Sequence, residues 1–284
     1  MLHTKLNLNQ LNTEDFKLSL HKPKLNYYMI GTIGAVTTVS IITINNYYQN
    51  SWWQETSTKF KFTNDWDYAL WIDKFGHFYG TYLIAHGFSA GLEACNFTIE
   101  QSYLYGGLAA LALQLYVEYQ DGYGPKWGFS PGDAISDVLG AGFAIGQYYY
   151  PYLKNFHPRV SYYPSEEYLN GEKEDANISD DYEGQKLWLS LRMKNILPKK
   201  IAEKWPAWLM LSVGYGVHNL DGSGGGDKEF HLAFDLDAEE LIPYKGPVWQ
   251  FITNTLNYIH FPMPGIKFYK GKASLSFGYS GVLD

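Results

Sequence analysis

Seven polar residues at the ends of apolar segments have the types and spacing to do chemistry. They are Asp73, Lys74, His77, Glu118, Asp121, Asp133 and Asp137. Burying an unpaired carboxylate is costly, so carboxylates beside apolar sequence need partners or a ligand. One imidazole with several carboxylates suits a divalent cation such as Mg²⁺, Mn²⁺ or Zn²⁺. The candidate ligands are His77, Glu118, Asp133 and Asp137.

The same groups also suit general acid–base catalysis, because crowded carboxylates raise one another's pKa. A structural interpretation competes with both. Asp133 lies three residues after Ser130, as in a capping box, and Asp73 could cap its own helix. A histidine on an apolar face is more often a hydrogen-bonded core group than a ligand. We favour a structural polar network over a catalytic or metal site at this stage, since the chain has no HExxH, Walker, dinucleotide or GxSxG motif.

The elements that carry these residues are three apolar segments of 18–20 residues, rich in Gly and Ala, at 75–92, 102–119 and 131–150. Their length and patterning predict helices. The third has a clear start, with Ser130 as N-cap and Pro131 in the first position.

Because residues four apart share a helix face, each helix carries one polar stripe, and the stripes should meet where the helices pack. His86 and Glu93 should point away from His77. In the third helix the pairs Gly140/Ala144 and Gly142/Gly146 favour close approach of helix backbones.

The N-terminal part is typical of a membrane anchor. Residues 27–44 contain no charged side chain, and their length is near the roughly 20 residues that a membrane-spanning helix needs. The aromatic run at 45–53 resembles an interface belt. A cleaved secretory signal is the alternative, and we favour the anchor because the polar leader before it, residues 1–26, is long for a signal.

The C-terminal part has a different character. Residues 161–184 hold eight acidic side chains and one lysine, which equals the whole net charge of −7 and predicts a solvated linker. Alternating aromatic and β-branched sequence then predicts strands at 185–193, 208–217, 229–237 and 272–280, with a short helix at 247–259. The prediction is an α+β fold, an N-terminal apolar helical unit followed by a β-rich region.

The expected boundaries are a polar segment at 1–26, an anchor or signal at 27–48, a helical domain at 63–152, the acidic linker at 161–184 and the β-rich region at 185–284.

Composition narrows the function classes. Aromatic residues make up 18% of the chain, which suits a surface at a membrane interface or an aromatic-rich soluble β domain. No basic face stands out, which argues against nucleic acid as a partner. The single cysteine, Cys95, excludes a disulfide within the chain.

Three stretches resemble the YfiM-like family of uncharacterised bacterial envelope proteins: DKFGHF (73–78), EYQDG (118–122) and WGFSPGDAISDVLGA (127–141). The segments SDDYEGQKLWLSLRM (179–193) and WPAWLMLSVGYGV (205–217) are similar to a longer form in Bacteroidota, and a weaker likeness reaches the VanZ-like membrane proteins. The resemblance implies an envelope location and membrane-packed helices, but no reaction. Family members are often described as lipoproteins; no lipobox cysteine is present here, so residues 27–44 are expected to anchor the chain, in the inner or the outer membrane.

Two functions follow as hypotheses. The first is a structural or accessory component of an envelope assembly, with membrane lipids and other envelope proteins as partners. The alternative is a membrane-embedded hydrolase or transferase that acts on a lipid or cell-wall precursor through the His/carboxylate residues. A soluble periplasmic binding module is a third, weaker candidate.

Overall fold

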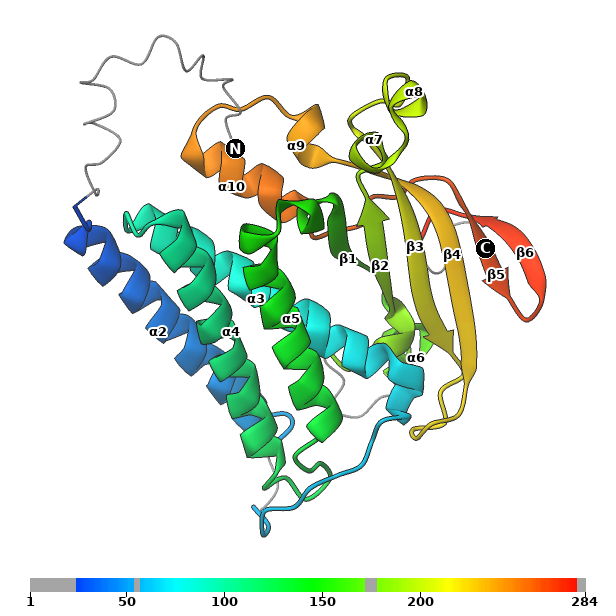
Figure 1. The fold of residues 1–284 in the computed structure, drawn as a ribbon. Coiled ribbons are helices and arrows are strands. Elements are labelled where there is room, and N and C mark those ends of the chain that lie inside the picture. The colour runs from blue at the N-terminus through cyan, green and yellow to red at the C-terminus, as the bar shows by residue number, and fades with distance from the viewer. Residues whose placement is uncertain (1–23, 54–56, 172–177, 280–284) are drawn as a thin grey trace.

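The computed structural model describes residues 24–53, 57–171 and 178–279. Long helices lie on one side of the molecule and an antiparallel six-stranded sheet on the other (Figure 1), which confirms the predicted α+β class. Most of the predicted polar segment 1–26 and the middle of the predicted acidic linker, residues 172–177, fall outside the described residues.

The long helices are α2 (Tyr27–Gln49), α3 (Ile72–Ala94), α4 (Ile99–Asp121) and α5 (Pro131–Tyr149). All three apolar segments expected to be helical are therefore helices, and their starts are chemically marked. Thr98 and Gln101 form a capping box at α4, and the Ser130 side chain accepts a hydrogen bond from the Asp133 amide at α5.

Glycines let α3, α4 and α5 approach closely. A Cβ on Gly140 would lie 2.3 Å from the Phe78 carbonyl oxygen of α3, and one on Gly106 would lie 2.3 Å from Ser89 Oγ. The Gly140/Ala144 prediction therefore describes a real helix contact. The Gly142/Gly146 prediction is wrong, because no atom lies within 4 Å of a Cβ built on Gly142. A spacing of four does not tell which small pair faces the neighbouring helix.

The sheet is a meander in chain order. Its strands are β1 (Phe156–Tyr162), β2 (Gln185–Leu191), β3 (Leu209–His218), β4 (Asp227–Leu236), β5 (Gly265–Tyr269) and β6 (Lys272–Ser276). The sequence predicted β2, β3, β4 and β6 but missed β1 and β5. Strand β1 contains Pro158, which weakens a strand signal, and β5 is only five residues long.

Short elements connect the long ones. They are η2 (Tyr68–Trp71), η3 (Pro151–Asn155), α6 (Glu166–Leu169), η4 (Tyr182–Gly184), α7 (Met193–Ile196), α8 (Lys199–Ala202), α9 (Ala238–Leu241) and α10 (Pro247–Leu256). Helix α10 confirms the helix predicted at 247–259, although it ends three residues earlier.

Two apolar clusters fix the helices to each other and to the sheet. Tyr82, Ala85, Ala110 and Ala144 are buried between α3, α4 and α5, and Tyr258 joins them from the chain after α10. The second cluster joins the start of α3 to β2 and β3 through Ala69, Ile72, Leu187 and Val217. The α3 helix is therefore the element that both parts of the fold share.

The described part of the acidic segment 161–184 is exposed in places, as at Glu166 and Glu167, but its last residues pack against the fold. Asp181 is fully buried and accepts hydrogen bonds from the Ser165 amide and the Tyr162 hydroxyl. The neighbouring Asp180 accepts one from the Trp52 indole, and Tyr182 reaches Asp73. Net charge predicted solvation, but here specific donors surround the carboxylates and offset their desolvation.

Helix α2 has no buried residue and lies at the outside of the helical side (Figure 1). Among the described residues it is the one helix long and apolar enough to cross a membrane, although a signal sequence would have the same character. It runs beside the other helices. The Asn26 amide bonds to the Cys95 carbonyl at one end, and Asn45 accepts from the Tyr116 hydroxyl near the other.

Candidate functional site

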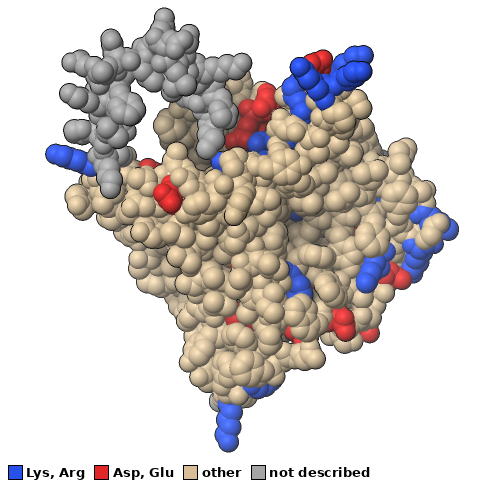
Figure 2. All heavy atoms as spheres, in the orientation of Figure 1, with Lys and Arg blue, Asp and Glu red and all other residues tan. Residues whose placement is uncertain are grey.

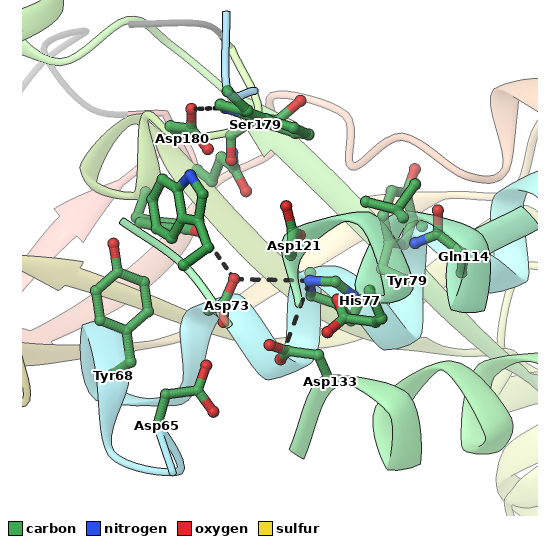
Figure 3. Close-up of a pocket in the computed structure, with 18 of the residues that line it drawn as sticks. Asp65, Tyr68, Asp73, His77, Tyr79, Gln114, Asp121, Asp133, Ser179 and Asp180 are labelled. Atoms are coloured by element: carbon green, nitrogen blue, oxygen red, sulfur yellow. Dashed lines mark hydrogen bonds and ion pairs between the residues drawn. The ribbon is translucent and has the colours of Figure 1, made fainter. Parts of the chain in front are cut away.

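All seven residues predicted to do chemistry come together where α3 begins, α4 ends and α5 begins. Figure 3 shows His77 between the carboxylates of Asp73 and Asp133, with Asp121 and Asp65 nearby. We call this set the His77 cluster. It contains six carboxylates and two cationic side chains: Asp65, Asp73, Glu118, Asp121, Asp133, Asp137, Lys74 and His77.

Lys74 neutralises one side of the cluster. Its Nζ lies 2.8 Å from both Asp73 Oδ2 and Asp133 Oδ1, and 3.0 Å from Asp65 Oδ2. Burial opposes its charge, but the carboxylates outweigh burial and raise the pKa of Lys74, so it stays protonated. Asp133 is therefore more than a capping residue. Its backbone amide completes the cap, while its carboxylate binds Lys74.

His77 lies at the centre, and its two ring nitrogens face different carboxylates. Nδ1 is 3.3 Å from Asp137 Oδ1 and 3.7 Å from Glu118 Oε1, whereas Nε2 is 3.9 Å from Asp73 and 4.0 Å from Asp133. Burial alone would lower the pKa of His77. The hydrogen bond to Asp137 and the surrounding negative charges raise this pKa to about 10, so the ring is an imidazolium at neutral pH.

The carboxyl groups differ in their affinity for a proton. Burial raises the pKa of Glu118 to about 8, and burial with the charge of Asp73 raises the pKa of Asp133 to about 7. The pKa of Asp73 is lowered, because His77, Lys74 and Tyr182 together outweigh the effect of burial. The site therefore holds protonated and ionised carboxyl groups side by side, which is how one site supplies both an acid and a base.

Asp137 is fully buried on α5, and its two oxygens have different surroundings. Oδ1 accepts from the Thr81 hydroxyl at 2.8 Å and from the Gln114 amide at 3.4 Å. Among the described residues, Oδ2 has no hydrogen-bond partner. Burying a carboxylate oxygen without a hydrogen-bond donor costs free energy, so the environment of Oδ2 calls for an explanation.

A strained turn fixes the start of α3. Ala69, Leu70 and Trp71 all have positive φ, at 47°, 55° and 78°, which side chains with a Cβ seldom adopt. The sheet side holds the turn in place. The Ala69 amide donates to the Ser223 carbonyl, and the Tyr215 hydroxyl donates to the Leu70 carbonyl. Such strain is maintained by surrounding contacts, and it places Asp73 and Lys74 immediately after the turn.

The cluster lines one wall of a cavity of about 1070 Å³. Asp73, His77, Glu118, Asp121 and Asp133 contribute the polar wall. Apolar side chains of α3, α4 and the first two strands also line the cavity, together with polar groups such as Gln185 and Asp180. The apolar ones are Tyr79, Leu83, Ile84, Val117, Val160 and Leu187. One continuous space is thus lined both by the charged groups of the His77 cluster and by apolar side chains.

Sequence reasoning missed several members of the site. Asp65 binds Lys74 and accepts from the Ser130 hydroxyl at 2.6 Å, while the Tyr182 hydroxyl donates to Asp73 at 2.7 Å. The Trp53 indole donates to Asp121 at 2.7 Å, so part of the predicted aromatic belt packs on the site. Tyr182 lies far from the motifs in sequence, and Trp53 and Asp65 precede the first motif outside any helix, so no spacing rule links these residues to it.

His86, one of the two residues expected to point away from His77, does so. His86 contacts Thr255 at 2.9 Å and stacks on Tyr258, on the side of α3 that faces α10. Burial lowers the pKa of His86 to about 4, so this ring is neutral, in contrast to His77.

The geometry admits a divalent cation on one side of His77. Ligand atoms of His77, Glu118 and Asp137 all lie within 4.8 Å of one another, and the Nδ1–oxygen distances of 3.3 and 3.7 Å are below the ~4.2 Å that two bonds of ~2.1 Å allow. A second set, Asp73, His77 and Asp133, lies on the Nε2 side next to Lys74. The four predicted ligands therefore do not surround one point, because Asp133 lies on the other side of the ring.

A comparison with protein-family models finds a match that covers the residues of the His77 cluster. Residues 62–149 match the model of the family described as "Predicted periplasmic lipoprotein (DUF2279)". The matched stretch contains all seven predicted residues and helices α3, α4 and α5, but neither α2 nor the sheet. No curated protein and no solved structure matches the chain.

The match supports an uncharacterised family of envelope proteins, and with the apolar helix α2 it fits a membrane-associated location in the cell envelope. The chain has one cysteine, Cys95, which lies inside the matched stretch. Cys95 is buried at the end of α3, and burial raises the pKa of its thiol.

Proposed function

We propose that this protein is a membrane-associated envelope hydrolase or transferase that acts on an amphiphilic substrate, a lipid or a lipid-linked cell-wall precursor. One observation carries the proposal: the His77 cluster, with its surplus of carboxylates, lines a cavity that apolar side chains of α3, α4 and the sheet also line. A purely structural network would have no need of that space. The apolar side chains suit an acyl or prenyl chain, and the charged groups suit a polar headgroup.

The carboxyl groups supply the acid and the base. Glu118, with its pKa of about 8, is protonated at neutral pH and suits proton donation to a leaving group. Asp73 is ionised and lies in the same cavity wall, where it can accept a proton from water or an alcohol. His77, as an imidazolium, stabilises negative charge that develops on the substrate.

A divalent cation bound by His77, Glu118 and Asp137 is an alternative form of the proposal, because Glu118 and His77 would then be deprotonated and could not act as acid and imidazolium. Six carboxylates around two cations leave a negative excess, and Oδ2 of Asp137 offers a lone pair without a donor. A bound cation would act as a Lewis acid toward the headgroup. It would also release the protons of His77 and Glu118, so cation binding should weaken as the pH falls.

A structural or accessory role is the second candidate, and a specific contact favours it. The Tyr182 hydroxyl donates to Asp73, and Asp73 binds Lys74, so the cluster also ties the helical unit to the chain before β2. In this role the network would hold two parts of an envelope component together, and other envelope proteins would be its partners.

The two candidates are separated by full-length protein in detergent with the variants Asp137→Asn and His77→Asn. Asp227→Asn, which removes a surface ion pair with Lys270, is the control. We would measure Mn²⁺ binding by electron paramagnetic resonance, product formation from a panel of lipids and lipid-linked cell-wall precursors by mass spectrometry, and the melting temperature.

An enzyme predicts that both variants keep their fold and lose turnover while the control keeps it, and loss of Mn²⁺ binding in the same variants supports the cation site. The structural role predicts early melting of both variants and no product from any protein. Product without Mn²⁺ dependence would remove the cation from the proposal and leave acid–base catalysis by Glu118 and Asp73.

The finer family assignment also remains a proposal. The filled positions of the YfiM-like pattern, from Asp73 to Ala141, support a YfiM-like protein of the long Bacteroidota form, with a more distant relation to VanZ-like proteins. Which membrane the protein joins follows from fractionation of inner and outer membranes.

A further inference from the structure

The sheet exposes an apolar face and buries a polar one. One face carries a row of apolar residues that runs across five paired strands: Leu189, Val213, Leu232, Ile266 and Leu275. All five are exposed, from 36% for Leu189 to 77% for Leu275. Three phenylalanines on the same face are also exposed, Phe230, Phe234 and Phe268. We call this surface the outer face.

The opposite face holds the polar residues, and these are buried. Strand partners alternate strictly, so the row next to the apolar one contains Ser190, Ser212, Ala233, Gly265 and Ser276. Other members of the inner face are Arg159, Lys186, Glu229, His231 and Asp235, each less than 5% exposed. A sheet in water normally buries its apolar face and exposes its polar one.

The sheet closes over its polar face from both ends. The Ser161 hydroxyl of β1 donates to the Gly278 carbonyl beyond β6, and His260, from the chain after α10, stacks on Trp188 at a ring distance of 3.7 Å. Near β1 to β3 the outer face is covered by the start of α3, through the contacts of Leu187, Tyr215 and Val217. From there to β6 it extends beyond the helices.

We propose that this outer face lies against the acyl chains of a membrane. Its extent along β4 fits a bilayer, since the ten residues of β4 span ~33 Å, close to the ~30 Å hydrocarbon thickness, whereas α3 covers the end of β3 that holds Tyr215 and Val217. A stretch of about ten residues with alternating apolar and polar side chains is the pattern of strands that face lipid on one side.

Charge and aromatic residues mark the edges of the band. Exposed lysines lie at both ends of the strands: Lys199, Lys200 and Lys204 in and after α8 at one end, and Lys228, Lys270 and Lys272 at the β3–β4 and β5–β6 turns at the other. On the side shown in Figure 2, charged side chains gather toward the ends of the molecule and the broad middle carries few. Lysines in these positions suit anionic headgroups, and Trp205 and Trp208 lie at the α8 end, where interface aromatics are expected.

This pattern favours lipid over a protein partner. Soluble monomeric proteins rarely expose a contiguous apolar surface of this extent. Protein interfaces combine an apolar centre with hydrogen-bonding groups, whereas the exposed row offers none from its side chains. Helix α2 supplies a second exposed apolar surface on the opposite side of the molecule (Figure 1). One membrane that contacts both surfaces accounts for both of them without a further component.

Fluorescence quenching in vesicles tests the proposal on the full chain. Cys95 is buried, so a Cys95→Ser background allows single cysteines at Leu232→Cys and Ile266→Cys on the outer face, and at Lys199→Cys on α8 as a control. Each is labelled with a small environment-sensitive dye, and the protein is reconstituted in phosphatidylcholine–phosphatidylglycerol vesicles. Quenching by lipids with a spin label on the acyl chain is compared with quenching by iodide in water.

We expect acyl-chain quenching at positions 232 and 266 at least threefold stronger than at position 199, and the reverse order for iodide. Iodide quenching at 232 and 266 equal to that at 199 would place the face in water and overturn the proposal. Protection from both quenchers would overturn it too, because the face would then be covered by protein, and crosslinking would tell a second copy from another partner.

Discussion

Two buried polar networks in this protein use the same residue types in opposite ways. The His77 cluster sets six carboxylates against Lys74 and His77 and lines a cavity. The network under the sheet is balanced. Asp235 pairs with Arg159, Glu229 with Lys186 and Asp237 with Arg192. Charge balance and the absence of the sheet acids from the cavity lining distinguish a structural network from a candidate site.

The sheet network even contains a serine, a histidine and an aspartate in contact. His260 Nδ1 lies 2.9 Å from Asp235, but the Ser190 hydroxyl donates to Asp235 and not to the histidine. A Cβ on Gly278 would lie 2.9 Å from His260 Nε2, so the backbone fills the place where a nucleophile would have to be. All three side chains are fully buried. Residue types alone would therefore suggest a catalytic triad here. The lack of solvent access and of a charge surplus argues against one.

The largest expected effect is in the sheet. Asp235→Ala leaves Arg159 buried without its carboxylate, and removing one partner of a buried pair costs about 3–5 kcal/mol. We expect a comparable loss of unfolding free energy in urea. Asp137→Ala should cost less unfolding free energy. Asp137 already has one oxygen without a donor, and its removal relieves crowding among the carboxylates. Equal losses would mean that the His77 cluster is as structural as the sheet network.

A second prediction concerns pH. Glu118 has a pKa of about 8 in the folded chain against 4.5 for an ordinary glutamate, so between these values the folded state binds the extra proton. Stability should therefore fall as pH rises from about 5 to 8, and Asp133 and His77, with raised pKa values, add to the same slope.

Glu118→Gln removes the Glu118 part of this slope. We expect melting temperatures near the wild type at pH 5 and several degrees above it at pH 8, measured by calorimetry in detergent. A variant that is less stable than the wild type at pH 8 would show that Glu118 is ionised in the folded chain and forms a stabilising ion pair with His77. That result would favour the structural role of the cluster.

How far the sequence leads can be judged from these same residues. Helical period and caps placed Asp73, His77, Glu118 and Asp137 on faces that meet, because those rules act within one helix or between neighbours. The sequence did not reveal Asp65, Tyr182 or Trp53, which reach the cluster through the turns of the tertiary fold.

The sheet shows the same limit. Alternation revealed β3 and β4, but not which face would be covered, and a rule that buries the apolar face would choose the wrong one for Leu232 and Ile266. The acidic segment shows a related limit, since charge counting cannot foresee the donors that surround Asp181.

A third, smaller effect tests how closely the cluster depends on helix packing. Gly140→Ala places a Cβ 2.3 Å from the Phe78 carbonyl, one turn from Asp137, and should force α5 away from α3 at a cost of about 1–3 kcal/mol. Gly142→Ala, two residues on, meets no atom within 4 Å and should stabilise by less than ~1 kcal/mol through helix propensity. Urea unfolding of both variants checks the pair. Similar effects from the two substitutions would show that α3 and α5 do not approach at Gly140.

The smallest expected effect is at the edge of the cluster. Burial raises the pKa of Asp121 to about 6, and the hydrogen bond from the Trp53 indole counteracts part of that rise. Trp53→Phe removes the bond, so the pKa of Asp121 should rise above 6. Because the bond stabilises the ionised form, the variant should lose about 1 kcal/mol at pH 8, where Asp121 is ionised, and nearly nothing at pH 5, where it is protonated. Calorimetry at the two pH values checks this, and an equal loss at both would mean that Trp53 acts through packing and that Asp121 does not share the electrostatics of the His77 cluster.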